Sequence, residues 1–243
     1  MPWYYGIAER EHFIQNPLSE RKVRRVGELM RLQPGCRVLD IACGRGGPAV
    51  VLAETFGCGV TGVERAPELA EAARERVDER QLSGLVKIVH ADVRELAPEP
   101  GSFDAVMCLG ATFIWDGLSG TCEALLPAVR PGGYLAVGEP FWRVCPLPAG
   151  VDSGREGHTD LVGTTERFQA AGVRLIGLVT SSAGDWDDYR SQEWRAVEEW
   201  LAENPAEPEA AEIEEQLEAR RDRYLRFERD LLNWAVLVGW KSR

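Results

Sequence analysis

The chain of 243 residues lacks the features of several large classes of protein. No apolar run approaches the roughly 20 residues that a membrane-spanning helix needs, and the first residues, MPWYY, begin no signal peptide. Its six cysteines include no Cys-x-x-Cys pair and no zinc-like spacing, and the chain contains no internal repeats. We therefore expect a soluble, cytoplasmic protein without a metal site.

Positive charge is scarce as well. The chain has 28 lysines and arginines against 39 acidic residues, for a net charge of −11. A protein that binds duplex nucleic acid usually carries the opposite charge or a basic stripe, and neither is present. Residues 185–230 alone hold sixteen acids and seven arginines. We interpret them as two solvated helix faces or, alternatively, as a surface that attracts a cationic substrate.

One stretch, residues 38–49 (VLDIACGRGGPA), has the pattern of a strand, a tight turn and a helix. Residues 38–41 are apolar apart from Asp40, and Pro48 suits the first turn of a helix because its missing N–H costs nothing there. Such a glycine-rich turn brings backbone amides and the positive end of a helix close to a ligand. With Asp40 at the strand end, the stretch predicts a cleft for a polar, hydroxylated small molecule.

Strands and helices alternate along most of the chain. The apolar patterns predict seven strands, at residues 38–41, 59–63, 86–90, 103–109, 134–137, 173–179 and 233–240. Helical patterns separate most of them, which predicts an α/β fold with a doubly wound parallel sheet and right-handed crossovers. The length fits one domain with a full core.

Two segments lie outside this alternation. The N-terminal residues precede the first strand, and the aromatic side chains near their start favour a helical lid over the cleft. Two long helical stretches, residues 187–202 and 207–232, look like an insertion between neighbouring strands, where substrate specificity often resides. We therefore divide one domain into an N-terminal lid (1–32), a cofactor-binding core (33–184), a helical insertion (185–232) and a final strand (233–243).

Three successive strands end in an acidic residue or an acidic turn, at Asp40, Glu64 and Asp92. In open α/β sheets the ligand lies outside the carboxyl ends of the strands. Glu64 follows Gly44 by 20 residues, the distance at which a carboxylate meets the hydroxyls of a ribose held over the first turn. Asp92, one strand further along, is placed to accept from the amine of an adenine. The three acids predict an adenosine lying across the strand ends.

The competing interpretation is a nicotinamide dinucleotide. The pattern Gly44-x-Gly46-x-x-Ala49 matches the relaxed form of that fingerprint. However, Asp40 lies where it would repel a pyrophosphate, and it suits a cationic amino group instead. Asp92 also adds a base contact that the dinucleotide fingerprint does not require.

Five segments, in this order, resemble the successive motifs of the class I S-adenosylmethionine-dependent methyltransferases. They are residues 38–47 (VLDIACGRGG), 62–64 (GVE), 91–93 (ADV), 103–106 (FDAV) and 125–134 (LLPAVRPGGY). The resemblance implies a Rossmann-like, seven-stranded sheet whose last strand is antiparallel, and S-adenosylmethionine as the cofactor. Residues 9–17 (EREHFIQNP) and Gly110-Ala111-Thr112 look like a subgroup that acts on small molecules.

The resemblance also implies roles for single residues. Asp40 and the glycine-rich turn would hold the amino and carboxylate groups of the cofactor; the turn residues are Ala42, Cys43, Gly44 and Gly46. Glu64 would bind the ribose and Asp92 the adenine amine. The residues that would flank the adenine are Arg65 and Val93, and those that would line the sulfonium are Leu109 and Gly110. Cys43 departs from the family pattern, but it is small enough to leave the turn undisturbed.

Methyl transfer from a sulfonium needs mainly alignment, and it needs a base only when the nucleophile must lose a proton early. Histidine is rare, with only His12, His90 and His158. We predict His12 in the lid and Glu139 at the end of the fifth strand as catalytic bases. Each also has a structural explanation, His12 as a buried histidine and Glu139 as a turn acid before Pro140.

Aromatic residues are candidates for an acceptor pocket and for a cation–π contact with the sulfonium. The predicted substrate-binding residues are Tyr5, Trp115, Phe141 and Trp186, with Trp142 and Tyr189 as further candidates. Each of them alone is also explained by ordinary core or lid packing.

We predict a methyltransferase that acts on a small organic acceptor. An alternative is an enzyme of the same fold that consumes S-adenosylmethionine by intramolecular displacement or cleavage, without a methyl acceptor. A third possibility is a non-catalytic protein that only binds the cofactor. The product separates the first two, since S-adenosylhomocysteine supports the former and methylthioadenosine the latter. Nucleic acid and membranes are not expected as partners.

Overall fold

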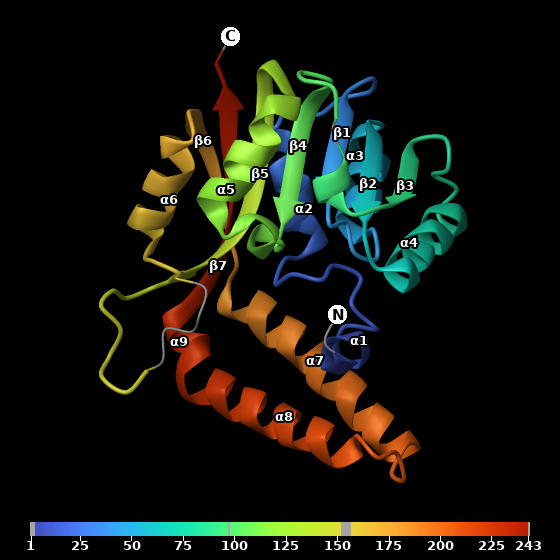
Figure 1. Ribbon diagram of the computed structural model, residues 1–243, viewed down its shortest axis with the longest axis vertical. Helices are drawn as coiled ribbons and strands as arrows, with labels where there is room; N and C mark the ends of the chain where they lie inside the picture. Colours follow the sequence, from blue (N-terminus) through green and yellow to red (C-terminus); the bar gives the residue numbers. More distant parts are fainter. Residues whose placement is uncertain (1–2, 97, 152–156, 243) are drawn as a thin grey trace.

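The computed structural model describes residues 3–96, 98–151 and 157–242, which contain a seven-stranded sheet in the order β3-β2-β1-β4-β5-β7-β6 (Figure 1). The strands are β1 (Arg37–Ile41), β2 (Gly59–Glu64), β3 (Val86–His90), β4 (Phe103–Leu109), β5 (Val129–Trp142), β6 (Val173–Thr180) and β7 (Leu232–Lys241). β1 to β5 pair in parallel, whereas β7 is antiparallel to both of its neighbours. The predicted fold is confirmed, including its antiparallel last strand.

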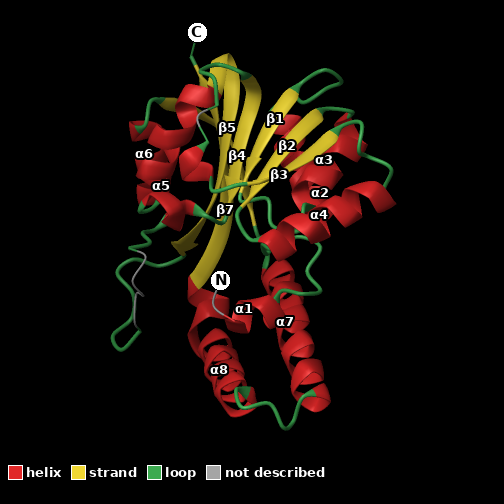
Figure 2. Ribbon diagram, turned by 45° about the vertical axis from the view of Figure 1, so that its right-hand side comes forward, coloured by secondary structure: helices red, strands yellow, loops and turns green. Residues whose placement is uncertain are grey.

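Helices cover both faces of the sheet (Figure 2). Helices α2, α3 and α4 lie on one face, and α5 and α6 on the other. The α-helices are α1 (Trp3–Ala8), α2 (Glu20–Leu29), α3 (Gly47–Phe56), α4 (Pro67–Glu79), α5 (Leu118–Leu125), α6 (Leu161–Ala170), α7 (Ala183–Glu203), α8 (Ala210–Arg223) and α9 (Arg229–Leu231). Among the described residues, no helix has the length and apolar character needed to cross a membrane.

Strand β1 shows how the sequence builds a core on each face. Val38 packs with side chains of α2 and α3, whereas Leu39 and Ile41 point to the opposite cluster, with α5 and α6. Successive side chains of a strand point to opposite faces, and helices on both faces bury all of them. Asp40 is therefore a buried carboxylic acid among the apolar, buried residues Val38, Leu39 and Ile41. Its position marks the candidate site.

The helices α7 and α8 form the expected insertion, because they lie between β6 and β7, which are adjacent in the sheet. They extend beyond the ends of the strands, and α1 packs against α7 (Figures 1 and 2). Helix α7 begins four residues earlier than predicted, because Ser182 and Asp185 form a capping box at its start. The helical stretch predicted for residues 207–232 runs without a break from Ala210 to Leu231, as α8, a π-helical turn at Tyr224–Glu228 and the short α9.

Strand β5 is much longer than the predicted residues 134–137. It pairs with β4 up to Gly138 and with β7 up to Trp142, so it reaches past the ends of the other parallel strands. The prolines at positions 131 and 140 hide this length in the sequence, since proline usually interrupts a strand. The extension carries the predicted residues Glu139 and Phe141 on a rigid strand rather than on a loop.

Gly138 lies where β4, β5 and β7 meet, and it leaves no room for a side chain. A Cβ atom on Gly138 would lie 2.6 Å from Cζ2 of Trp234 and 3.2 Å from the Cα of Leu109. Trp234 is buried, and its ring cannot move away freely because protein cores are close-packed. The indole of Trp234 in β7 thus holds Gly138 of β5 close against Leu109, the last residue of β4.

We expect Gly138→Ala to destabilise the protein by about 1–3 kcal/mol, because overpacking forces a shift of the indole or of the backbone. Thermal unfolding followed by circular dichroism measures the effect. Gly84→Ala is the matched control, since a Cβ there has no atom within 4 Å. Equal melting temperatures for the two variants would contradict the packing described here.

Candidate active site

Asp40, the last residue but one of β1, and Glu64, the last residue of the adjacent strand β2, form the centre of the candidate site. The side chain of Asp40 is 2% exposed, and its Oδ2 atom has no hydrogen-bond partner. Burial, and secondarily the negative charge of Glu64, raise the pKa of Asp40 well above its ordinary value. A buried carboxylate of this kind is stabilised by a cationic group beside it, and the described protein residues supply none at Oδ2.

The turn after β1 has the backbone of a ligand-binding loop. Ala42, Gly44 and Gly46 all have positive φ angles, of 53°, 56° and 77°. Glycine adopts this region freely, whereas alanine does so at a cost of roughly 1–2 kcal/mol. Cys43 lies between them with its side chain on Gly62, where a Cβ would be only 2.8 Å from Sγ. Burial raises the pKa of the Cys43 thiol, so this residue acts as a small apolar side chain.

Four backbone amides of this turn are engaged within the protein. Cys43 N donates to the carbonyl of Val63 over 3.1 Å, and Gly46 N donates to the carbonyl of Cys43 over 2.9 Å. Gly44 N donates to Glu64 Oε2 over 3.0 Å. The other oxygen of Glu64 accepts from Ala66 N over 2.8 Å, so this carboxylate ties the turn to the end of β2.

The remaining amide, Arg45 N, donates to Gln15 Oε1 over 2.9 Å. Gln15 belongs to the segment between α1 and α2, which covers the turn at several points. The Gln15 carboxamide occupies the space that a Cβ on Gly44 would need, and the carbonyl of Phe13 does the same at Gly47. Gln15 was not among the predicted site residues. Its only signal in the sequence was its place in the stretch of residues 9–17 that resembles small-molecule methyltransferases.

Asp92 lies at the end of β3, as predicted, but its carboxylate already has a strong partner. Both oxygens accept from Arg94: Oδ1 from the backbone N and from Nε, each over 3.0 Å, and Oδ2 from Nη2 over 2.5 Å. These bonds lower the pKa of Asp92. Arg65 Nη1 lies 4.0 Å from the same carboxylate, and Val93 begins the 3₁₀ turn that follows. The predicted adenine contacts are therefore neighbours in space.

Leu109 and Gly110 lie at the tip of β4, next to Asn16 of the N-terminal segment and Trp234 of β7. Gly110 has a φ of 98°, and a Cβ there would lie 2.7 Å from Asn16 Oδ1 and 3.1 Å from Cη2 of Trp234. The structure thus places Asn16 and Trp234, neither of which was predicted, beside the two residues expected to line the sulfonium.

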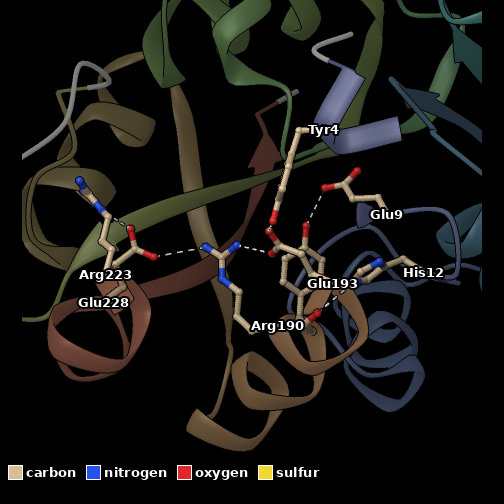
Figure 3. A network of polar contacts seen from close by, with 8 residues as sticks. Tyr4, Glu9, His12, Arg190, Glu193, Arg223 and Glu228 are labelled. Carbon is tan, nitrogen blue, oxygen red and sulfur yellow. Dashed lines mark hydrogen bonds and ion pairs between the residues drawn. The ribbon is translucent and has the colours of Figure 1, made fainter. Parts of the chain in front are cut away.

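The two predicted bases lie in different surroundings. His12 is 1% exposed, and its Nε2 donates to the backbone carbonyl of Tyr189 in α7 over 2.9 Å, while Nδ1 has no partner (Figure 3). Glu139 is buried in β5, with His158 Nδ1 3.9 Å from its Oε1. Glu139 follows Gly138, which is in register with Leu109, so it lies one residue beyond the last pair between β4 and β5. The structure does not bring His12 and Glu139 together.

The predicted acceptor residues are also dispersed. Trp186 packs in the core cluster on the α2 and α3 side, and Trp115 packs against the opposite cluster. Tyr5 belongs to a third cluster, between α1, α7 and α8, where the guanidinium of Arg220 lies 4.6 Å from its ring. Phe141 is buried in β5. Trp186, Trp115 and Tyr5 therefore lie in three different clusters.

A pocket of about 190 Å³ lies between the N-terminal segment, the start of α2 and one face of α7. Its lining residues are Phe13, Ile14, Asn16, Leu18, Ser19, Glu20, Asp185, Asp188, Tyr189 and Gln192. Two aromatic rings and several polar or acidic groups surround it. Asn16 connects this pocket with Gly110, because it lines the former and contacts the latter.

Comparisons with known proteins give this geometry a context. Residues 38–133 match the family described as "Methyltransferase domain". The protein YjhP of Escherichia coli K12 is 31% identical over 244 residues, which cover 98% of both chains, and its X-ray structure gives a TM-score of 0.90. A methyltransferase from Geobacter sulfurreducens, crystallised with S-adenosyl-L-homocysteine, is 29% identical with a TM-score of 0.92, covering 100% of this chain and 99% of that one.

A third relative is the 27-O-demethylrifamycin SV methyltransferase of Amycolatopsis mediterranei, 28% identical over 202 residues. These residues cover 81% of this chain and 73% of the relative. Together the relatives favour the adenosyl interpretation of the strand-end acids over the dinucleotide one.

We expect Asp40→Asn to raise the stability of the ligand-free protein at neutral pH. Because the pKa of Asp40 is higher in the folded than in the unfolded chain, folding favours the protonated acid. Wild-type stability should therefore fall as the pH rises from about 4 through the folded pKa, and the variant should lack this loss. Denaturant unfolding between pH 4 and 8 tests this. Asp222→Asn, an exposed residue paired with Arg226, is the control and should change little.

Proposed function

This chain belongs to the class I S-adenosylmethionine-dependent methyltransferases, and from that premise we propose that it transfers the sulfonium methyl group to a small organic acceptor. One observation carries most weight. The buried Asp40 has an unpaired oxygen beside a turn of positive φ angles, with Glu64 at the next strand end, in a chain that matches an S-adenosylhomocysteine complex over its full length. We also propose the division of one domain into a lid, a core, an insertion and a final strand, with the bounds predicted above.

The residues of the site fit this cofactor chemically. Asp40 Oδ2 would accept from the ammonium group of the methionine part, which would relieve the cost of its burial. Each Glu64 oxygen accepts one backbone bond and keeps a second lone pair that would serve the ribose hydroxyls. Asp92, Arg65 and Val93 would surround the adenine at the end of β3. Leu109 and Gly110 would lie beside the sulfonium.

The cofactor supplies an activated methyl group, so the protein has mainly to align the nucleophile with it. Orientation of this kind can contribute several kcal/mol of the barrier reduction. Of the two predicted bases, we propose Glu139 for acceptors that must lose a proton, because it lies in β5 one residue beyond the pair of Gly138 with Leu109, the last residue of β4. His12, whose Nε2 is bound to the carbonyl of Tyr189, would act as a positioning residue for the segment that covers the turn.

A small acceptor is supported by three observations. The pocket beside α7 has a volume of about 190 Å³, which suits a small molecule, and Asn16 links it to the tip of β4. The Amycolatopsis relative is named for a small-molecule substrate. The net charge of −11 is unfavourable for binding nucleic acid.

The free thiols of all six cysteines support a reducing, cytoplasmic compartment.

We expect Glu64→Gln to weaken binding of S-adenosylhomocysteine by about ten- to hundredfold, because hydrogen bonds to a charged group are worth about 1.5–3 kcal/mol. Isothermal titration calorimetry measures the affinity. Glu71→Gln, an exposed residue paired with Arg74, is the control and should bind like the wild type. Wild-type protein that binds neither S-adenosylmethionine nor S-adenosylhomocysteine would overturn the proposed cofactor site.

Acceptor screening with labelled S-adenosylmethionine tests the reaction itself. We expect turnover to yield S-adenosylhomocysteine together with a methylated small molecule. Formation of methylthioadenosine without a methylated product would instead show that the cofactor is consumed by intramolecular displacement or cleavage.

A further inference from the structure

The glycine-rich turn is connected to α7 by a short chain of side chains. Gln15 Oε1 accepts from Arg45 N of the turn over 2.9 Å, and Gln15 Nε2 donates to Glu9 Oε2 over the same distance. The hydroxyl of Tyr189 in α7 donates to the other oxygen of Glu9 over 2.8 Å (Figure 3). The side chains of Gln15, Glu9 and Tyr189 thus connect the glycine-rich turn to the helical insertion.

Further contacts hold Tyr189 and Gln15 in these positions. Burial and the charge of Glu9 raise the pKa of Tyr189 well above its ordinary value, so its hydroxyl remains a donor. The backbone carbonyl of Tyr189 accepts from His12, on the same N-terminal segment as Gln15. The side chain of Gln15 cannot shift toward the turn, because it already fills the space beside the Cα of Gly44.

The next residue of α7 extends the connection to the rest of the insertion. Arg190 donates to Glu193 over 2.6 Å and to Glu228 over 3.3 Å, and Tyr4 of α1 donates to Glu193 over 3.1 Å (Figure 3). The rings of Trp186, Tyr189 and Tyr224 each lie within 6 Å of the Arg190 guanidinium. These contacts hold α1, α7 and the π-helical turn after α8 together directly beside Tyr189.

We propose that Gln15 is a positioning residue that couples occupancy of the cofactor site to the placement of α7, through Glu9 and Tyr189. The N-terminal segment lies over the turn that would hold the methionine part of the cofactor, and Tyr189 lines the pocket assigned to the acceptor. We call the arrangement with this segment on the turn closed: a ligand that binds best to the closed arrangement stabilises it, because a ligand favours the state that it binds best. The inference depends on the cofactor site of the proposed function but not on the identity of the acceptor.

The coupling has a measurable consequence for affinity. If S-adenosylhomocysteine binds the closed arrangement, any break in the chain lowers the population of that arrangement and weakens apparent binding. A single hydrogen bond is worth enough to change the affinity about three- to tenfold. A break at Tyr189 should act on the ligand although Tyr189 contacts neither Asp40 nor the turn directly.

A double-mutant cycle on S-adenosylhomocysteine binding tests the proposal. We expect Gln15→Ala and Tyr189→Phe each to weaken binding about three- to tenfold, and the double variant to bind no more weakly than the weaker single variant, because one chain is broken once. Tyr134→Phe is the control: Tyr134 of β5 packs against the core beside Ala105, toward the start of β4, and has no part in the chain, so this variant should bind like the wild type.

Hydrogen exchange supplies a readout that a purely structural role would not produce. In the wild type, the ligand should protect residues 9–16 and residues 185–193 together, whereas in Gln15→Ala it should no longer protect the second region. Wild-type affinity in Tyr189→Phe, or penalties that simply add in the double variant, would overturn the coupling. A wild type that does not bind S-adenosylhomocysteine would instead contradict the proposed cofactor site. Failure of the coupling and failure of the cofactor site therefore give different results.

Discussion

The site depends on the burial of two carboxylates, Asp40 and Glu64, at the ends of adjacent strands. Two like charges in a poorly hydrated place are unfavourable unless each has a partner. Glu64 has two backbone amides, which turn its charge into a tie between the glycine-rich turn and β2. Asp40 keeps an oxygen without a partner, and its raised pKa reflects that cost. This unpaired oxygen is the physical basis on which we propose that the site binds a cationic group of the ligand.

The N-terminal segment completes the site by tight contact rather than by a loose covering. Side-chain and backbone atoms of Phe13, Gln15 and Asn16 lie where Gly47, Gly44 and Gly110 have no Cβ atom. These glycines are therefore needed for the approach of another part of the chain as well as for backbone freedom. The same segment also contacts Tyr189 of α7 through Glu9 and His12, so it connects the glycine-rich turn to the insertion.

Some of the predicted site residues lie at one edge of the sheet, whereas others lie in separate parts of the core. Asp40, Glu64 and Asp92 follow strands whose topology is readable from alternating patterns, so their common edge was predictable. The aromatic candidates were chosen for their chemistry alone, and Tyr5, Trp115 and Trp186 lie in three different clusters. Gln15 and Trp234 were missed because a glutamine in a loop and a tryptophan in a strand carry no local signal for the partners they contact.

The sequence by itself determined the order of strands and helices, the glycine-rich turn and the acids at the strand ends, because side-chain periodicity and turn chemistry are local properties. It also indicated the insertion between β6 and β7, from two long helical patterns before a last strand. Only the tertiary structure decided that β5 extends to Trp142 along β7 and that Gln15 lies on the turn. These features arise from contacts between residues far apart in the chain, and no local pattern of amino acids records such a contact.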